Sequence, residues 1–394
     1  MRAGRRGPVA GRTRAMWKTA SILIGIVLVL MTVGFVMLGS TSGVLARSDT
    51  VGVGHFVARQ AVWIALALVA GAVAARLDYH AWQRLAVPFG LLALALLVMA
   101  LVPGLGMRIK GSRRWLSFGL FHFQPSELAK IAIVVLLAWW MKRQGRRSGS
   151  LVHGLLIPGG ILALFAGLIL GGPDVGTTVL VMLVGGGVLL VGGARPLYLV
   201  VAGAGGFSLL TLAVLHDELR MRRILAFLEP EAYARDEAFQ LINALYAFVV
   251  GGTWGAGFGQ SLQKRYYLPE AHTDFIFAIV GEELGVFASL GVLVLFAGLF
   301  ACGLVIAVRA PDPFGRLLAV GLTLMLGVQA LMNIAVVTGS MPTTGIALPF
   351  MSYGGSSLIV SSVMVGMLVN ISLHAGGMVR DEDTRAIKDR THRW

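Results

Sequence analysis

The chain has 394 residues, of which 57% are hydrophobic and 13% are charged, and its mean hydropathy is +0.81. This composition excludes an ordinary soluble globular protein, because a water-exposed surface needs more charged and polar residues. The net charge of +14 can arise from membrane topology alone, so it does not require a nucleic-acid partner. The single cysteine, Cys302, lies in an apolar run and excludes an internal disulfide.

Long apolar runs predict an all-α integral membrane protein with about ten transmembrane helices. About 20 helical residues cross a hydrocarbon core, and the 52 glycines are typical of helices that pack closely in a membrane. The eighth span is too long for one upright crossing, which predicts a tilt or a start outside the hydrocarbon core. The expected spans lie near residues 19–39, 60–75, 86–103, 125–141, 154–171, 177–193, 197–215, 275–307, 314–338 and 355–376.

The first span needs to be distinguished from a secretory signal. Basic residues precede it, and small residues would allow a cut between Ala46 and Arg47. However, the apolar part of a signal peptide is about 7–15 residues long, and this run is longer and is followed by further spans. We therefore expect an uncleaved anchor. The predicted organisation is a basic cytoplasmic tail (1–18), a membrane domain (19–376) with a large outer loop (216–274), and a polar cytoplasmic tail (377–394).

The distribution of lysine and arginine predicts the orientation, because cytoplasmic loops are enriched in these residues. An even number of spans places both termini on one side, and the basic N-terminal tail indicates that this side is the cytoplasm. The cytoplasmic loops then contain Arg76, Arg84, Lys142, Arg143, Arg146, Arg147, Arg195, Arg309 and Arg316. The outer side contains Arg47, Arg59, Arg108, Lys110, Arg113, Arg114, Arg220, Arg222, Arg223, Arg235, Lys264 and Arg265.

Cations on the outer side oppose this topological rule, so another function is expected to retain them. Lysine and arginine bind phosphate, and arginine does so through two parallel hydrogen bonds. The outer cations therefore predict an anionic lipid or a phosphorylated ligand. The alternative is simple contact with lipid headgroups.

Three carboxylates follow the large outer loop. Asp274 lies where the loop enters the eighth apolar run, and Glu282 and Glu283 lie deeper in that run. A carboxylate in lipid-facing sequence is costly, so its default interpretation is functional. For Asp274 the competing interpretation is a helix cap, a position that Thr273 or Asp274 would suit. We expect Glu282 and Glu283 to make structural pairs or caps.

Two further segments contain residues suited to binding. In FQPSELAK (123–130), Glu127 and Lys130 share one helix face and would either neutralise each other or present the lysine to a phosphate. In MPTTGIALPFMSYGGSS (341–357), prolines and glycines predict irregular backbone, which membrane proteins tolerate where it is buried or lines a wet cavity. Its hydroxyls would bind sugar or phosphate, unless the segment is a plain interhelical loop. They belong to Thr343, Thr344, Ser352 and Ser356.

Several motifs, in this order, resemble the SEDS family (shape, elongation, division and sporulation proteins). They run through most of the membrane region: ARQ (58–60), GSRRWL, QPSELAK, PDVGTT, RMRRILAFLEP, LPEAHTDFIFAIVGEELG and LPFMSYGGSS. The sixth motif is closer to the cell-division members than to the elongation members, which usually differ at the positions of Ala271 and Gly281.

The resemblance implies a peptidoglycan glycosyltransferase that polymerises lipid II on the outer face of the cytoplasmic membrane at the division septum. The donor would be a glycan on undecaprenyl pyrophosphate, and its anomeric centre would invert. The resemblance assigns the essential acid to Asp274, with the role of base toward the acceptor hydroxyl. We expect Arg59, Arg114 and Lys130 to bind the pyrophosphate, Glu127 to orient Lys130, and His272 to flank the base.

The resemblance also implies partners. These are lipid II, a class B penicillin-binding protein (an FtsI-like transpeptidase), other divisome proteins and membrane lipids, without nucleic acid. A divalent cation, Mg²⁺ or Mn²⁺, would suit the pyrophosphate, although no carboxylate cluster specifies one. The alternatives are a lipid II flippase, a non-catalytic scaffold for a transpeptidase, and a role in elongation instead of division.

Overall fold

The computed structural model describes residues 7–48, 53–109, 112–119, 121–263 and 272–377. Each of the ten expected spans coincides with a helix. These helices are α1 (Gly7–Ser48), α2 (Val53–Arg76), α4 (Ala86–Leu101), α5 (Pro125–Gln144), α6 (Ile157–Gly171), α7 (Val175–Val191), α8 (Pro196–Leu215), α12 (Ile276–Arg309), α13 (Pro313–Val337) and α14 (Gly355–Ala375). Among the described residues, seven helical stretches are long and apolar enough to cross a membrane. The all-α membrane fold is confirmed, and the number of crossings stays a prediction.

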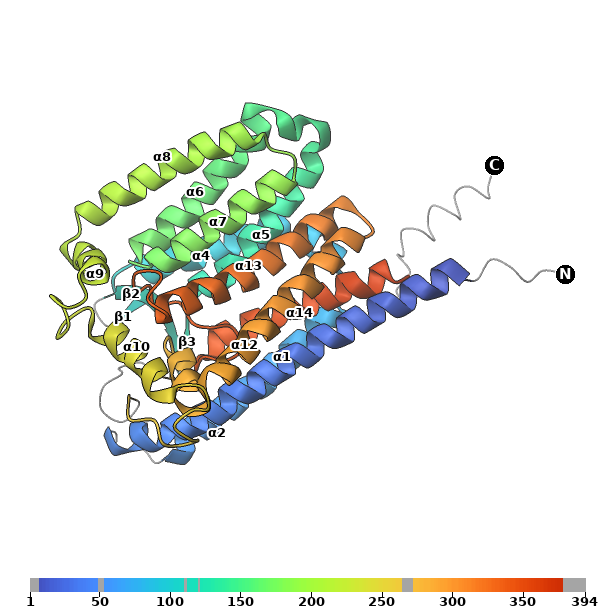
Figure 1. Ribbon diagram of the computed structural model, residues 1–394. Helices are drawn as coiled ribbons and strands as arrows, with labels where there is room; N and C mark the ends of the chain where they lie inside the picture. The colour runs from blue at the N-terminus through green and yellow to red at the C-terminus, as the bar shows by residue number, and fades with distance from the viewer. Residues whose placement is uncertain (1–6, 49–52, 110–111, 120, 264–271, 378–394) are drawn as a thin grey trace, which may run out of the picture.

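The helices run back and forth between two ends of the bundle (Figure 1). We call them the terminal end, where α1 begins and α14 ends, and the loop end, which holds the long connections. The terminal end also contains α3 (Tyr79–Arg84), the 3₁₀ helix η1 (Gly145–Gly149) and the π-helix η2 (Val152–Leu156). The loop end contains α9 (Glu218–Leu228) and α10 (Phe239–Gly251), which fall within the expected large outer loop.

Helices α5, α13 and α14 lie inside the bundle, and α8 lies at its edge. The apolar window of α14 is 83% buried and that of α13 is 67% buried, against 6% for α8. Helix α14 packs along α2, and glycines allow this approach: a Cβ at Gly366 would lie 2.2 Å from the Gly71 carbonyl oxygen. Small residues at helix contacts are the usual means of tight packing in membranes.

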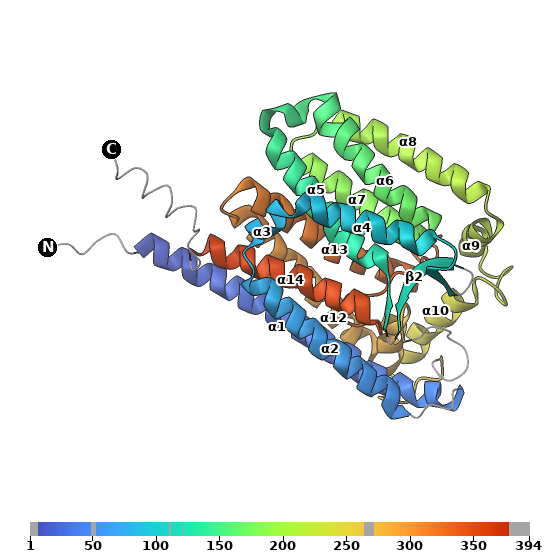
Figure 2. The same cartoon turned by 180° about the vertical axis from the view of Figure 1, so that it is seen from behind.

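A three-stranded antiparallel sheet lies at the loop end, between α4 and α5 (Figure 2). Its strands are β1 (Gly106–Ile109), β2 (Ser112–Phe118) and β3 (Phe121–Phe123), and Leu116 of β2 pairs with both Gly106 and Phe123. These strands were not predicted from the sequence. The sheet gives the polar connection between two helices a fixed shape, because its backbone groups pair with one another.

The eighth span is broken rather than simply tilted. Gly285 has φ 78° and ψ −174° inside α12, a left-handed region that favours glycine. The connection after α10 fills the break: the Val286 amide donates to the Gly252 carbonyl, and the Ala256 amide donates to the Glu282 carbonyl. An inserted segment that takes over helix hydrogen bonds is a recognised cause of a sharp kink. The break explains the excess length of this span.

Glu282 and Glu283 fasten the same connection to α12. The Glu282 carboxylate accepts hydrogen bonds from Ser261 and from the Leu262 amide. The Glu283 carboxylate accepts from Ser40 of α1 at 2.8 Å and from the Gly259 amide at 3.0 Å. Both glutamates are almost completely buried. Their contacts are structural, because they satisfy backbone and hydroxyl donors that would otherwise be buried without partners.

Candidate functional site

The centre of the candidate site is the connection between α13 and α14, residues 338–354, at the loop end. It is irregular, as its prolines and glycines predict. The hydroxyl of Ser352 accepts from the Leu348 amide at 2.8 Å, and the Ser352 amide donates to the Leu348 carbonyl at 3.1 Å. Phe350 has a positive φ of 66°, which is unusual for a bulky residue. Ser352 therefore shapes this connection, and its expected role in binding substrate stays a prediction.

Asp274 lies against this connection. The side-chain amide of Asn333, on α13, donates to the Asp274 carbonyl at 2.8 Å and to the Ile346 carbonyl at 2.7 Å. A Cβ added at Gly345 would lie 3.5 Å from the Asp274 Oδ2 atom, so the carboxylate borders Gly345. Phe275, rather than Asp274, occupies the N-cap position of α12. Asp274 is half-buried.

A network of buried polar side chains from α5 and α13 holds the connection in place. Gln329, one helical turn before Asn333, donates to the Ala347 carbonyl at 2.9 Å. Its side-chain oxygen accepts from the Lys130 ammonium at 2.8 Å, and the same ammonium contacts the Glu127 carboxylate at 2.8–2.9 Å. Lys130 is only 2% exposed. The expected contact between Glu127 and Lys130 is present, but it neutralises the lysine inside the protein.

Arg114 reaches the site from strand β2. Its guanidinium lies 3.7 Å from the Asp174 carboxylate, which caps α7 by accepting from the Thr177 amide at 3.0 Å. The start of α7 packs on the central connection: a Cβ at Gly176 would lie 2.8 Å from Ile346 and 2.9 Å from Thr344. The pair of Arg114 and Asp174 therefore borders the same segment as Asp274.

Tyr353, near the end of the connection, contacts His272 and lies within the electrostatic influence of Arg59. The Tyr353 amide donates to the His272 carbonyl at 2.9 Å, and the two rings lie 5.6 Å apart. Burial raises the pKa of Tyr353, and the charge of Arg59 acts in the opposite direction. The phenol therefore stays neutral at physiological pH and can donate a hydrogen bond. Arg59 itself is exposed.

The start of α14 completes the site. Gly354 is its N-cap residue and supplies no capping side chain, so the first amides of the helix depend on other partners. Such amides, together with the helix dipole, favour an anion. Ser356 lies in this first turn, and Thr343 lies in the connection; both are half-buried. The Thr344 hydroxyl is buried and has no hydrogen-bond partner among the described residues.

Some of the other cations expected on the outer side form ion pairs, and others are not described by the structure. Arg220 pairs with Asp217 at 3.0 Å, and Arg222 pairs with Glu218 at 2.8 Å, so part of the expected positive charge is neutralised on α9. Three of the expected cations lie outside the described residues: Lys110, Lys264 and Arg265. The structure likewise does not describe the side chains of Arg47, Arg108 and Arg113.

Three residues of the site were missed in the sequence: Asn333, Gln329 and Tyr353. Gln329 and Asn333 are polar residues four positions apart in an otherwise apolar span. That spacing places both on one helix face, and polar residues within a membrane helix usually face the bundle interior. This pattern was the available signal for the pair. Tyr353 carries no comparable signal, because aromatic residues are common near membrane interfaces.

Comparisons with known proteins agree with this architecture. The FtsW/RodA/SpoVE family, described as "Cell cycle protein", matches residues 20–376. A probable peptidoglycan glycosyltransferase FtsW from Trichlorobacter lovleyi is 39% identical, over 89% of this chain and 92% of that protein. The FtsW of Geobacter sulfurreducens strain PCA, also described as a probable peptidoglycan glycosyltransferase, is 41% identical over 87% and 92%. Stage V sporulation protein E from Bacillus subtilis is 38% identical over 90% and 97%.

Two solved structures share the fold. A chain of a peptidoglycan synthase complex, described in terms of the coordination of polymerization and crosslinking, has a TM-score of 0.71 and 28% identity, over 90% of this chain and 97% of that one. The crystal structure of the rod shape determining protein RodA from Thermus thermophilus has a TM-score of 0.66 and 28% identity, over 91% and 97%. The matched residues include every element that positions Asp274. The chain therefore belongs to the FtsW/RodA/SpoVE family of cell cycle proteins.

Proposed function

We propose that this chain is a peptidoglycan glycosyltransferase that polymerises lipid II on the outer face of the cytoplasmic membrane during cell division. The names of its FtsW relatives support this activity and the role in division. The single observation that carries the proposal is the position of Asp274, a half-buried carboxylate beside Gly345 at the loop end. Asp174 also borders this connection, but its carboxylate is buried and caps α7.

The reaction requires a base at the acceptor and a charge partner at the leaving group. Asp274 would take the proton from a lipid II sugar hydroxyl as its oxygen attacks the anomeric carbon of the donor glycan. The bond from that carbon to undecaprenyl pyrophosphate breaks on the opposite face, which inverts the centre. Cations and oriented amides would stabilise the charge that develops on the pyrophosphate. Arg59 and the first turn of α14 are the accessible groups for this task.

The three expected cations differ in how easily they could reach a pyrophosphate. Lys130 is buried with Glu127 and would contact it only after that ion pair opens. The Arg114 guanidinium already lies 3.7 Å from the Asp174 carboxylate. We therefore assign the first contact to Arg59. Among the described residues no group of three histidine, cysteine, aspartate or glutamate side chains could hold a metal ion. A Mg²⁺ or Mn²⁺ ion at the pyrophosphate stays a prediction, and no protein ligand is assigned to it.

The orientation and the partners are part of the same proposal. Among the described residues, Asp78 and Asp312 are the acidic residues of the terminal end, which is otherwise rich in lysine and arginine. That excess favours a cytoplasmic terminal end, with both termini inside and Asp274 outside. The similarity to a chain of a peptidoglycan synthase complex supports a class B penicillin-binding protein as partner. Septal location and further divisome partners follow from the division role.

The test is polymerisation of labelled lipid II by the purified chain with its transpeptidase partner. We expect Asp274→Asn to abolish the polymer, because an amide cannot accept the proton. The matched control is Asp217→Asn, where the residue caps α9 and asparagine caps about as well as aspartate. Unimpaired polymerisation by Asp274→Asn would remove this residue as the base. Movement of lipid II across liposomes without polymer would instead favour a flippase.

A further inference from the structure

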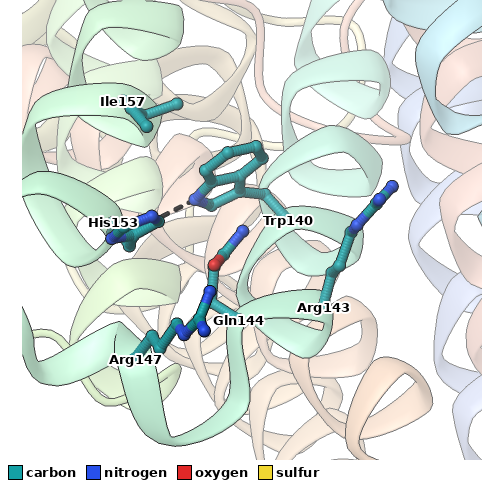
Figure 3. Close-up of a pocket in the computed structure, with 6 residues that line it drawn as sticks. All are labelled: Trp140, Arg143, Gln144, Arg147, His153 and Ile157. Atoms are coloured by element: carbon teal, nitrogen blue, oxygen red, sulfur yellow. Dashed lines mark hydrogen bonds between the residues drawn. The ribbon is translucent and has the colours of Figure 1, made fainter.

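A pocket at the terminal end belongs to neither the candidate site nor the bundle core. It has a volume of about 560 Å³ and is lined by Trp140, Arg143, Gln144, Arg147, His153 and Ile157 (Figure 3). This volume lies within the range of roughly 300–1,000 Å³ that is usual for small-ligand sites. The pocket lies at the end of α5 and the start of α6, whereas Asp274 lies at the opposite end of the bundle.

The local backbone builds this pocket. Helix α5 ends at Gln144, its C-cap residue Gly145 has a positive φ of 51°, and η1 and the wider π-helix η2 lead into α6. The Trp140 indole donates to the His153 carbonyl at 2.9 Å and ties α5 to η2. Gly154 of η2 also packs closely against the backbone of η1, because a Cβ at Gly154 would lie 1.9 Å from the Ser148 carbonyl oxygen. π-helical turns are rare and are frequent at functional sites.

The pocket carries positive charge that no described carboxylate neutralises. Arg143 lies over the Trp139 ring at 5.7 Å, and neither Arg143 nor Arg147 pairs with an acidic side chain in the described part of the chain. Lys142, the neighbour of Arg143, behaves differently: it donates to Gln83 at 2.7 Å and lies 4.0 Å from Asp312. The two arginines are therefore available to an anion, for which their guanidinium groups are well suited.

One side of the pocket is bordered by exposed apolar side chains. Ile157 lines it, and Leu151, Val152 and Leu156 beside it are each at least 45% exposed. Trp140 lies between His153 and Arg143 in the close-up (Figure 3), and tryptophan is a residue type that is enriched at membrane interfaces. A ligand of this pocket would therefore place an anionic group beside the arginines and an apolar group beside α6.

We propose that this pocket binds the headgroup of an anionic phospholipid from the membrane leaflet at the terminal end. The phosphate would contact Arg143 and Arg147, and the acyl chains would lie along the exposed apolar face at residues 151–157. Basic pockets between transmembrane helices are known to bind such headgroups. Free phosphate shares the headgroup chemistry but has no use for the apolar side. The proposal does not depend on glycosyl transfer.

The test is lipid retention by the purified full-length chain, measured by native mass spectrometry with phosphatidylglycerol and phosphatidylcholine of matched acyl chains. We expect the wild type to prefer phosphatidylglycerol. The double variant Arg143→Gln, Arg147→Gln is expected to reduce that preference by about 10- to 30-fold. Each of the two arginines contributes to the electrostatic attraction for the anionic headgroup, and both contributions are lost. The matched control, Arg195→Gln with Arg316→Gln, removes two exposed charges from the same end and is expected to keep it.

Three results would overturn the proposal. Undiminished phosphatidylglycerol binding by the pocket variant would show that the arginines do not hold the headgroup. An equal loss in the control would show a general charge effect without a site. Displacement of the lipid by millimolar inorganic phosphate, to the same extent for short and long acyl chains, would reassign the pocket to free phosphate. Unchanged thermal unfolding of the variants checks that they are folded.

Discussion

At the residue scale, the position of Asp274 depends on a side chain of another helix. Asn333 holds the Asp274 carbonyl and the Ile346 carbonyl with one amide group, so it fixes the distance between the carboxylate and the central connection. Gln329 repeats this arrangement one turn away by holding the Ala347 carbonyl. Positioning of this kind matters for catalysis, because a displacement of about 1 Å can cost roughly a hundredfold in rate.

We therefore expect Asn333→Leu to lower polymerisation. The leucine is similar in size but leaves two carbonyl groups without their donor, each a loss of about 1–3 kcal/mol if the group stays buried. We expect kcat to fall at least tenfold with a smaller change in KM, measured with labelled lipid II. Asn370→Leu is the control, since Asn370 also holds two backbone groups, at the terminal end. It should reduce thermal stability and leave kcat almost unchanged; an equal fall in kcat would contradict the positioning role.

Variants of Lys130 can separate its contribution to protein stability from a contribution to substrate binding. Lys130→Met removes the charge and strands the buried Glu127 carboxylate, which should destabilise the protein by about 3–5 kcal/mol. Adding Glu127→Gln removes the stranded charge and should restore most of the stability, measured by thermal unfolding in detergent. If the double variant is stable but its KM for lipid II rises, Lys130 also contacts the pyrophosphate. Full activity of the double variant would limit the pair to a structural role.

At the element scale, α12 acts as two helices joined at Gly285. The short first part, residues 276–284, is buried and follows Asp274 directly, and the second part carries the exposed apolar face. The connection after α10 fits into the break through backbone hydrogen bonds: its Gly252 carbonyl accepts from the Val286 amide, and its later amides donate to the Glu282 and Glu283 carbonyls. The break therefore couples the outer connection to the segment that carries the proposed base.

Gly285→Ala tests this coupling. Its Cβ would lie 2.5 Å from the Thr253 carbonyl oxygen and from the Gly255 amide nitrogen, and its φ is unfavourable for alanine. We expect lower thermal stability and faster protease cleavage within residues 252–263. Gly291→Ala is the matched control in the same helix, because a Cβ there meets nothing within 4 Å. It should be neutral or stabilising by up to about 1 kcal/mol. Similar behaviour of the two variants would show that the break carries no special constraint.

The elements were predictable to different degrees, for physical reasons. The ten helices follow from apolar runs, since a segment surrounded by lipid has to satisfy its backbone internally. The break at Gly285 could not be predicted from these runs, because glycine is common in membrane helices and the inserted connection is distant in sequence. The position of Asp274 at the start of the eighth span was predictable from the end of the polar loop, and its role as base stays a prediction. The neutralisation of Lys130 and Arg114 was only partly predictable: Glu127 is three residues from Lys130, whereas Asp174 meets Arg114 through tertiary packing.

At the scale of the whole molecule, the two ends of the bundle carry different chemistry. The loop end holds Asp274, the sheet and the helices α9 and α10, with acidic and basic residues mixed. The terminal end holds the basic pocket and the tied termini, where Ser372 donates to the Met16 carbonyl at 2.9 Å. The proposed glycosyl transfer and the proposed phospholipid site therefore require opposite sides of the membrane.

This arrangement predicts the labelling of single cysteines by a membrane-impermeant maleimide. In a Cys302→Ser background, Thr253→Cys at the loop end should react in intact cells, and Arg146→Cys at the terminal end should react only after permeabilisation. Both positions are exposed, so accessibility to the reagent depends on the side of the membrane. The reverse pattern would place Asp274 in the cytoplasm, away from any extracellular glycan, and would exclude polymerisation on the outer face. Labelling of both residues in intact cells would show that the reagent enters, and a larger maleimide would then decide between the two orientations.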